Sequence, residues 1–459
     1  MDQIERERLR GALSRLVAER NKLAERFLAE MEFAEGLLRL HPGRRRRWQR
    51  PLAEAWRRVA DVVAAGRLDW LAKAVSDAEG ILAPVGKLAK TYTVHCVGHA
   101  HIDMNWMWSW PETVAVTNDT FLTVLKLMEE FPDFCFTQSQ ASVYAIAKEY
   151  LPEVFERIRR RVAEGRWEIA AVHWVEGDKN LASGESLARH MLYTRRFMAE
   201  SFGLAPEDLP LDWEPDTFGH AATIPTIVSR GGVRQYYLCR GGKFAKPPVF
   251  RWKGPDGSEV LVNVETTWYN DHLGPHNAPA MLAFCQKTGL RDWMCVYGVG
   301  DHGGGPTRRD IHRAHEMDSW PIYPSFRLAT TRKYYGIIES RAAELPELEG
   351  ELNFEFTGCY TSQSRIKRAN RLAEHLMELA ESAAVLAWRV AGRPYPAEQL
   401  RDGWIDTIFG HFHDILPGSG VRETREYQMG QFQRVAALTT AIGTDSLRSL
   451  AAAVDTARL

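Results

Sequence analysis

TYTVHCVGHAHID, residues 91–103, joins an apolar strand to an imidazole and a carboxylate. Consecutive side chains of a strand alternate between its two faces, so His101 and Asp103 share one side. Displayed together at the end of a buried strand, these two groups suit a divalent cation better than they suit packing. A hydrogen-bonded surface cluster is the competing interpretation, because His-x-His runs also occur in amidohydrolase barrels, metallo-lactamase folds and ordinary loops.

The chain after Thr93 alternates short apolar strands with helices, which is typical of a parallel sheet buried on both faces. The predicted strands are TYTVHCVG (91–98), DFCFTQ (133–138), WEIAAV (167–172), LPLDW (209–213), QYYLCR (235–240), VLVNVE (260–265) and WMCVYGVG (293–300). Active sites of α/β barrels gather at the carboxyl ends of their strands. The polar groups that follow these strands are therefore expected to face one pocket: Asp103, Gln138, Glu176, Asp216, Arg240 and Asp301.

Both ends of the chain show helical patterns. Residues 2–40 predict one long helix stopped by His41-Pro42-Gly43, with two shorter helices to about residue 82. After Leu352 the pattern predicts helices over 363–392, 397–412 and 422–451. The expected α/β fold is a seven-stranded (β/α) barrel over 91–350, preceded by an N-terminal helical segment over 1–90. A C-terminal three-helix bundle over 351–459 follows the barrel.

Composition and charge exclude several classes of partner. The chain has 459 residues, 25% of them charged, and a net charge of −1, so no global attraction to nucleic acid or to an anionic membrane is expected. The N-terminus is charged from its start, and no apolar run approaches the roughly eighteen residues that span a bilayer. Six scattered cysteines without a Cys-x-x-Cys pair indicate buried thiols in a reducing compartment. We expect a cytoplasmic protein.

Two further clusters of metal-competent groups lie far along the chain. The stretch DWEPDTFGH (212–220) holds Asp216 and His220, and GHFHDILPGSG (410–420) holds His411, His413 and Asp414. The strings HAHIDMNW, WEPDTFGH and HFHD, in this order, resemble the family 38 glycoside hydrolases, the retaining α-mannosidases. Further family-like stretches are WVEGDKNLASGES from Trp174, FRWKGPDGS from Phe250, GVGDHGGGPT from Gly298 and YTSQSRIKRANR from Tyr360. The resemblance runs from about Thr93 to about Tyr427.

The resemblance implies one divalent metal ion. It maps the metal ligands onto His101, Asp103, Asp216 and His413. Two imidazoles and two carboxylates suit zinc first, with cobalt, manganese or calcium open according to how many sugar oxygens and waters join. Because His413 lies in the predicted bundle, the bundle would have to dock against the barrel mouth.

The resemblance also implies catalytic and substrate-binding residues. Retaining glycosidases use one carboxylate as nucleophile and a second as general acid/base, and Asp216 and Asp301 are the respective candidates. A glycine-rich turn held by Asp301 is the competing interpretation of that segment. His302 departs from the family pattern, and tuning of Asp301 and substrate binding both stay open for it. The candidates for substrate binding are Trp106, beneath the sugar ring, together with Arg240, Tyr269 and Asp414. Glu176 could face the substrate or support a ligand histidine, so it is left out of the predicted site.

The resulting prediction is a metal-dependent retaining α-mannosidase that removes terminal α-mannosyl residues through a covalent mannosyl-aspartate. Family members usually continue into β-rich C-terminal domains, whereas this chain ends at Leu459. It is thus a minimal form, a fragment, or one half of an enzyme that a homo-oligomer or a partner chain completes. A metal-dependent deacetylase or amidohydrolase on a related barrel, and a catalytically silent sugar-binding protein, are the alternatives.

Overall fold

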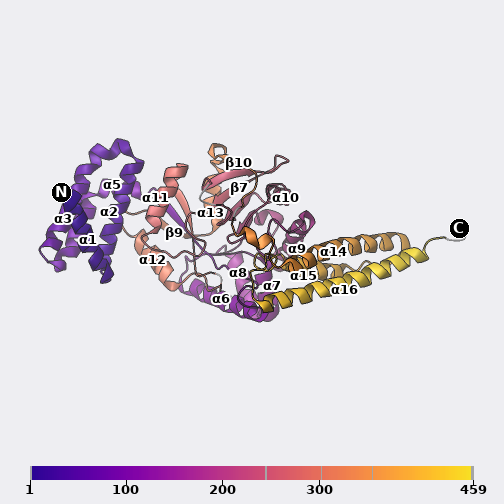
Figure 1. Cartoon of the computed structure of the whole chain (residues 1–459). Coiled ribbons are helices and arrows are strands. Elements are labelled where there is room, and N and C mark those ends of the chain that lie inside the picture. Colours follow the sequence, from indigo (N-terminus) through magenta and orange to yellow (C-terminus); the bar gives the residue numbers. More distant parts are fainter. Residues whose placement is uncertain (1–2, 243–245, 301, 354, 456–459) are drawn as a thin grey trace.

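The computed structural model describes residues 3–242, 246–300, 302–353 and 355–455. A cluster of helices stands at one end of the molecule, the strands and their helices form the middle, and long helices project from the other end (Figure 1). This is a mixed α/β barrel with helical parts on both sides, so the predicted fold class is confirmed. The residue boundaries of its three parts, at about 90 and 350, remain our proposal.

Five helices build the N-terminal cluster: α1 (Gln3–Ala18), α2 (Lys22–Leu40), α3 (Arg45–Ala64), α4 (Leu71–Ile81) and α5 (Ala83–Ala89). The prediction of one helix over 2–40 was wrong. Arg20 takes a left-handed backbone with φ 64°, and the Asn21 side chain accepts the backbone N–H groups of Leu23 and Ala24. Because such a cap satisfies the free donors at a helix start, a second helix begins here and folds back on the first.

Ten strands occur in the described residues: β1 (Thr93–Gly98), β2 (Phe136–Gln138), β3 (Trp167–Ile169), β4 (Leu211–Glu214), β5 (Gln235–Leu238), β6 (Val249–Lys253), β7 (Glu259–Val264), β8 (Asp292–Tyr297), β9 (Ser325–Ala329) and β10 (Glu347–Glu349). All seven predicted strands are present. β1 lies between β8 and β9, with all three parallel. A second ladder runs β10-β6-β7-β5-β4, and β2 pairs with β3.

Three strands were not predicted, each for a local reason. β6 pairs antiparallel with β7 across a turn in which Gly257 has φ +82°, so it belongs to a hairpin and not to the strand–helix alternation. β9 carries the exposed Arg327, and β10 is a short edge strand with two exposed glutamates. Such sequences lack the continuous apolar run that marks a buried parallel strand.

Helices connect and cover the strands: α6 (Trp110–Glu130), α7 (Ala141–Tyr150), α8 (Pro152–Ala163), α9 (Gly184–Phe202), α10 (Ile224–Arg230), α11 (Asn277–Thr288), α12 (Arg308–Asp318) and α13 (Thr331–Glu339). Short 3-10 turns occur at Pro42–Arg44, Leu68–Trp70, Pro206–Asp208, Ala342–Glu344 and Thr357–Tyr360. The core splits in two, and β1 contributes Val94, Cys96 and Val97 to the part that also contains the N-terminal helices. The N-terminal helices therefore pack directly on the barrel.

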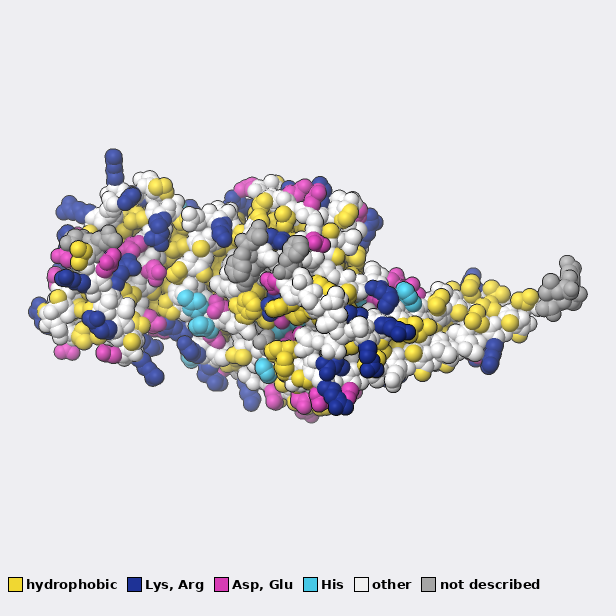
Figure 2. Space-filling view, viewed as in Figure 1, with side chains coloured by type: hydrophobic (Ala, Val, Ile, Leu, Met, Phe, Trp, Pro, Cys, Tyr) yellow, Lys and Arg dark blue, Asp and Glu magenta, His cyan; other side chains and the backbone are white. Residues whose placement is uncertain are grey.

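The C-terminal bundle consists of α14 (Ser364–Ala391), α15 (Ala397–Phe409) and α16 (Arg422–Ala452). α14 and α16 are far longer than α15 and extend away from the barrel as an arm (Figure 1), on whose surface apolar side chains are visible (Figure 2). α15 ends three residues before the predicted limit, at Phe409. His411, His413 and Asp414 therefore lie in the loop between α15 and α16, which reaches back to the strand ends.

The sequence also predicted buried thiols and helices too polar or too short to cross a bilayer. All six cysteines are free; four are buried as expected, whereas Cys135 and Cys359 are half-buried. Among the described residues, no helix combines the length and the apolar character that crossing a bilayer requires. Cytoplasmic residence stays a prediction.

Candidate metal centre and pocket

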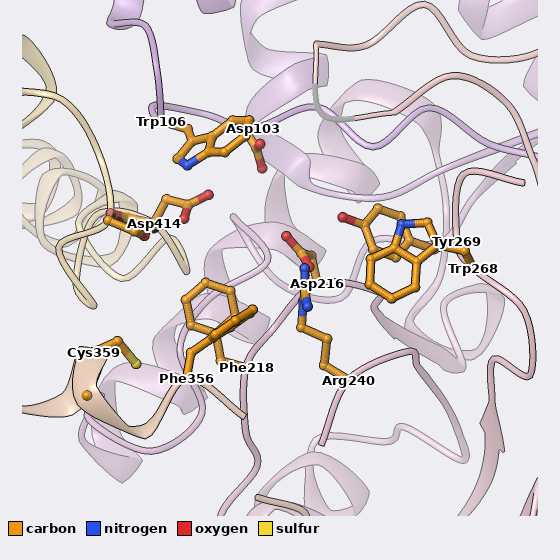
Figure 3. Close-up of a pocket in the computed structure, with 12 residues that line it drawn as sticks. Asp103, Trp106, Asp216, Phe218, Arg240, Trp268, Tyr269, Phe356, Cys359 and Asp414 are labelled. Atoms are coloured by element: carbon orange, nitrogen blue, oxygen red, sulfur yellow. Dashed lines mark hydrogen bonds and ion pairs between the residues drawn. The ribbon is translucent and has the colours of Figure 1, made fainter. Parts of the chain in front are cut away.

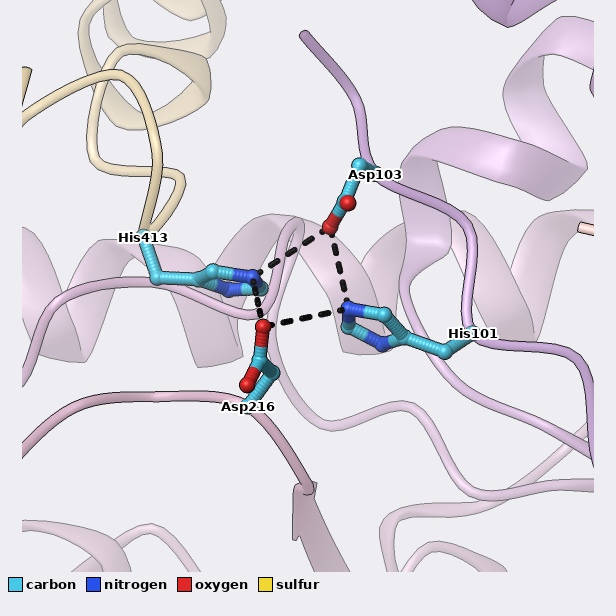
Figure 4. A group of neighbouring side chains, drawn as sticks. All are labelled: His101, Asp103, Asp216 and His413. Atoms are coloured by element: carbon cyan, nitrogen blue, oxygen red, sulfur yellow. Dashed lines mark ion pairs between the residues drawn. The ribbon is translucent and has the colours of Figure 1, made fainter. Parts of the chain in front are cut away.

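Four side chains from three distant segments meet at the carboxyl ends of the strands (Figure 4). His101 and Asp103 follow β1, Asp216 follows β4, and His413 comes from the α15–α16 loop. Nε2 of His101 lies 2.9 Å from Oδ1 of Asp103 and 3.9 Å from Oδ2 of Asp216. Nε2 of His413 lies 3.4 Å and 3.6 Å from the same two oxygens. The fold thus brings together all four residues predicted as metal ligands.

This geometry fits a small divalent cation. Bonds of about 2.0 to 2.1 Å to a tetrahedral ion place neighbouring ligand atoms about 3.3 Å apart, and the observed separations bracket that value. Nε2 of both histidines is buried without a hydrogen bond of normal geometry in the described part of the chain. Two neutral imidazoles and two carboxylates would also balance a charge of +2. The donor set therefore suits an ion such as zinc.

Glu176 orients both histidines. Its Oε2 lies 3.0 Å from Nδ1 of His101, and its backbone carbonyl accepts Nδ1–H of His413 at 2.8 Å. Ser139 in turn donates its hydroxyl to the other oxygen of this carboxylate. A proton on Nδ1 leaves the lone pair on Nε2, the atom that faces the cluster, so the Glu176 carbonyl favours the metal-binding tautomer of His413, and the Glu176 carboxylate stands beside the same nitrogen of His101. Of the two roles that the sequence left open for Glu176, the contacts favour support of the ligand histidines.

The charges of the cluster attract positive charge. Burial disfavours the imidazolium of His101, but the carboxylates of Glu176 and Asp103 outweigh burial and hold its pKa well above the usual value. Burial likewise lowers the pKa of His413, yet the nearby carboxylates of Asp103, Asp414 and Asp216 raise it to about 9. Burial raises the pKa of Asp216, partly offset by His413 and Arg240. The carboxylates therefore favour either protons on the imidazoles or a cation between them.

A cavity of about 530 Å³ opens beside this cluster (Figure 3). Small-molecule binding sites typically have volumes of about 300 to 1,000 Å³. Each residue predicted to bind substrate lines the cavity: Trp106, Arg240, Tyr269 and Asp414. The buried residues Asp103 and Asp216 line it as well, so the cluster forms part of the cavity wall. The sequence did not indicate Phe218, Trp268 or Phe356, which form much of its apolar wall.

Arg240 holds the Asp216 carboxylate in place. Its Nε donates to Oδ1 of Asp216, so one carboxylate oxygen faces Arg240 while the other faces the histidines. The guanidinium lies 5.1 Å from the ring centroid of Trp268 and 4.9 Å from that of Phe356. Cation–π contacts of this kind restrict the arginine. Arg240 is thus built into the site through Asp216 as well as lining the cavity.

The other predicted positions lie around the cavity and in the segment that follows β8. Asp301 lies outside the described residues. Its described neighbour Gly300 packs so closely that an added Cβ would stand 3.4 Å from Cβ of His101, while the His302 ring packs 4.6 Å from that of Trp108. Tyr269 contacts the His101 ring at 5.0 Å, and Oδ1 of Asp414 accepts the Ser419 hydroxyl.

Two histidines of the sequence clusters point elsewhere. His220 hydrogen-bonds through Nδ1 to the Tyr236 hydroxyl at 2.8 Å. His411 hydrogen-bonds to His190 and Asn370 between the barrel and α14. The rings of His411 and His413 thus point in different directions, and of these two only His413 reaches the cluster.

Comparisons with known proteins identify the family of this chain. Residues 91–355 match the model of the glycosyl hydrolases family 38 N-terminal domain, and residues 355–450 match that of the alpha mannosidase middle domain. Alpha-mannosidase G of Dictyostelium discoideum is 34% identical over 78% of this chain and 33% of its own length. Human alpha-mannosidase 2C1 is 31% identical over 75% of this chain and 34% of its own length. The chain thus spans about a third of these relatives.

The fold is also that of a solved structure. The alpha-mannosidase from Enterococcus faecalis V583 superposes with a TM-score of 0.71 and 24% identity, over 80% of this chain and 44% of that one. The first matched family residue, 91, comes after α5, so the N-terminal helices precede the matched region. Because the first family model alone covers more than half of the sequence, the chain belongs to glycoside hydrolase family 38.

Proposed function

We propose that this chain carries the catalytic centre of a metal-dependent retaining α-mannosidase, which hydrolyses terminal α-mannosyl residues through a covalent mannosyl-aspartate. The observation that supports it best is the convergence of His101, Asp103, Asp216 and His413 at the wall of one cavity. Hydrolysis of aryl α-mannosides by the purified chain, stripped of metal and reloaded with zinc, cobalt, manganese or calcium, is the direct test. An amide substrate run in parallel separates this activity from that of an amidohydrolase.

The four side chains would hold the ion, which when bound would orient sugar hydroxyls and stabilise negative charge as a template. Asp216 would supply the nucleophile, since it lines the cavity and Arg240 fixes the orientation of its carboxylate. A cation beside Asp216 would favour the ionised carboxylate and so counteract the effect of burial on its pKa. Trp106 would support the sugar ring. Tyr269 and Asp414 would bind hydroxyl groups.

Uptake of the ion should release protons. Both ligand histidines have raised pKa values, that of His413 being about 9, which favours the imidazolium form in the metal-free site. Binding needs the lone pairs of the imidazoles, so we expect protons to leave when the ion binds at pH 7. Affinity should therefore fall as pH is lowered. Calorimetric titration in buffers of different ionisation enthalpy measures the proton count; no release at pH 7 would contradict these ligands.

Asp301→Asn tests the proposed acid/base. General acid catalysis typically contributes 10² to 10⁴-fold, so cleavage of alkyl mannosides should fall by about that factor. A dinitrophenyl leaving group needs little protonation, so the first step with that mannoside should stay nearly intact and deglycosylation should limit turnover.

Added azide, which attacks the mannosyl-enzyme without a base, should then restore turnover and yield the α-azide. If Asp301→Asn slows both substrates equally and azide has no effect, Asp301 is structural. His302→Ala separates the two roles left open for that ring: a changed ratio of the two substrates indicates tuning of Asp301, and an unchanged ratio with a raised KM indicates substrate binding.

The protein also needs partners, an ion and a cellular compartment, and we propose each of them. We propose that the protein works in an assembly, with a second copy of the chain or with a separate chain that carries β domains as its partner. Zinc is the proposed resident ion, and the cytoplasm the proposed compartment. If glycosidase activity appears only on addition of such a chain, the centre described above is incomplete alone.

A further inference from the structure

A second group of metal-competent side chains lies outside the proposed catalytic centre, between β7 and α11. Asp271, His272 and His276 each offer one ligand atom, and these atoms lie within 4.8 Å of one another. Oδ1 of Asp271 is 3.1 Å from Nε2 of His276 and 3.5 Å from Nδ1 of His272. The two imidazole rings stand 4.5 Å apart. One carboxylate oxygen is thus shared between two histidines.

These separations also suit the ligands of one metal ion, although Asp271 and His276 hydrogen-bond directly in its absence. Bonds of about 2.1 Å place neighbouring ligand atoms about 3.0 Å apart around an octahedral ion and about 3.4 Å apart around a tetrahedral one. Two histidines and one carboxylate leave open positions for water or another ligand, as in several known metal sites. The histidine side chains are 63% and 43% exposed, so an ion can reach them without rearrangement of the fold.

The loop that carries the group is held rigidly. Asn277 is buried; its Oδ1 accepts the backbone N–H of Gly274, and its Nδ2 lies 3.2 Å from Nε2 of His276. The backbone N–H of Leu273 bonds to Asp310 in α12. The backbone carbonyl of Asp271 accepts N–H of Gly298 at the end of β8. Anchors on both sides hold the three ligands close together before any ion binds, which reduces the entropy cost of binding.

A separate cavity of about 550 Å³ adjoins the two histidines. The α1–α2 turn and α12 form its other walls and contribute Arg20, Arg309 and Arg313. Arg313 is already paired with Glu25 and Glu316. The guanidinium groups of Arg20 and Arg309 weaken the attraction of this cavity for a metal ion. They also favour an anion at the open coordination positions of an ion bound by the histidines. Histidine side chains are visible on the surface where the N-terminal helices meet the rest of the chain (Figure 2).

We propose that Asp271, His272 and His276 form a second divalent metal site, separate from the His101 cluster and independent of the glycosidase function. Imidazole ligands favour late first-row ions, so zinc, cobalt and nickel are its expected occupants. With one carboxylate in place of two and with exposed histidines, it should bind more weakly than the buried cluster. An anion or water from the adjoining cavity completes the coordination.

Counting bound ions in matched variants tests the site. The full chain, stripped with chelator and equilibrated by dialysis with Co²⁺, Ni²⁺ or Zn²⁺, should bind a second, weaker equivalent. The double variant His272→Ala/His276→Ala should lose that equivalent, with an affinity reduced by more than about 100-fold, since removing two ligands exceeds the usual effect of removing a supporting residue. Asp271→Asn should weaken it too. The visible spectrum of bound Co²⁺ should change accordingly.

Two controls separate this site from the other. His375→Ala removes an equally exposed imidazole from α14 and should leave both equivalents. His413→Ala should remove the tight equivalent and spare the weak one, so failure of either site is seen independently. A wild-type chain that binds no ion outside the His101 cluster at millimolar free metal refutes the proposal. So does a second equivalent that persists unchanged in the double variant.

Discussion

Asp216→Ala should lower kcat/KM for aryl α-mannosides by at least about 10⁴-fold, more than any other single substitution. The expected loss is this large because the change removes the proposed nucleophile and a metal ligand together. Asp216 also pairs with Arg240, so the variant leaves Glu355, whose Oε2 lies 3.8 Å from Nη1, as the carboxylate beside that guanidinium. Steady-state rates at saturating metal, with circular dichroism to verify the fold, measure the effect.

Asp103→Asn distinguishes the two roles of Asp216. It removes a proposed metal ligand but no nucleophile, so excess metal should recover part of its activity, whereas Asp216→Ala should stay inactive at any metal concentration. A mechanism-based fluoro-mannosyl probe should label the wild-type peptide that contains Asp216. A label on a different peptide, or an Asp216 variant that regains activity with excess metal, would overturn the assignment.

His413→Ala should lower the affinity of the tight metal site by more than about 100-fold, because loss of a ligand should exceed the effect of losing a supporting residue. Nε2 of His413 faces both carboxylates of the cluster. Activity should fall in parallel and recover partly at high metal concentration. Equilibrium dialysis followed by elemental analysis gives the affinity.

His411→Gln is the matched control for that variant. His411 lies two residues away, is equally buried and bonds to His190 and Asn370 instead. Glutamine keeps hydrogen-bonding capacity, so metal affinity should stay near that of the wild type. If His413→Ala binds the ion as tightly as His411→Gln, His413 is no ligand, and the bundle only packs against the barrel.

Local patterns predicted most of the fold. The seven parallel strands and the three C-terminal helices carry long apolar runs or helical periodicity, which depend on neighbours in sequence. The break between α1 and α2 was missed because a single asparagine cap, Asn21, interrupts an otherwise continuous helical pattern. β9 and β10 were missed because edge strands with charged residues resemble loops. Propensity alone cannot decide such short segments.

The sequence predicted some residues of the candidate site and missed others. His101 and Asp103 follow from alternation along one strand, and the remaining assignments came from the family resemblance. Glu176 gave an ambiguous signal because one carboxylate in a glycine-rich stretch suits several roles. Phe218, Trp268 and Phe356 are ordinary core residues by sequence, and only their positions around Arg240 place them in the cavity wall.

By itself the sequence determined the chemical types at the site, the strand ends that carry them and the family to which the chain belongs. Only the tertiary structure decided that Glu176 contacts His101 and His413 at once. The physical reason is that side-chain direction in loops depends on packing between segments hundreds of residues apart. The α15–α16 loop reaches the barrel strands through such packing, and no local pattern encodes that distance.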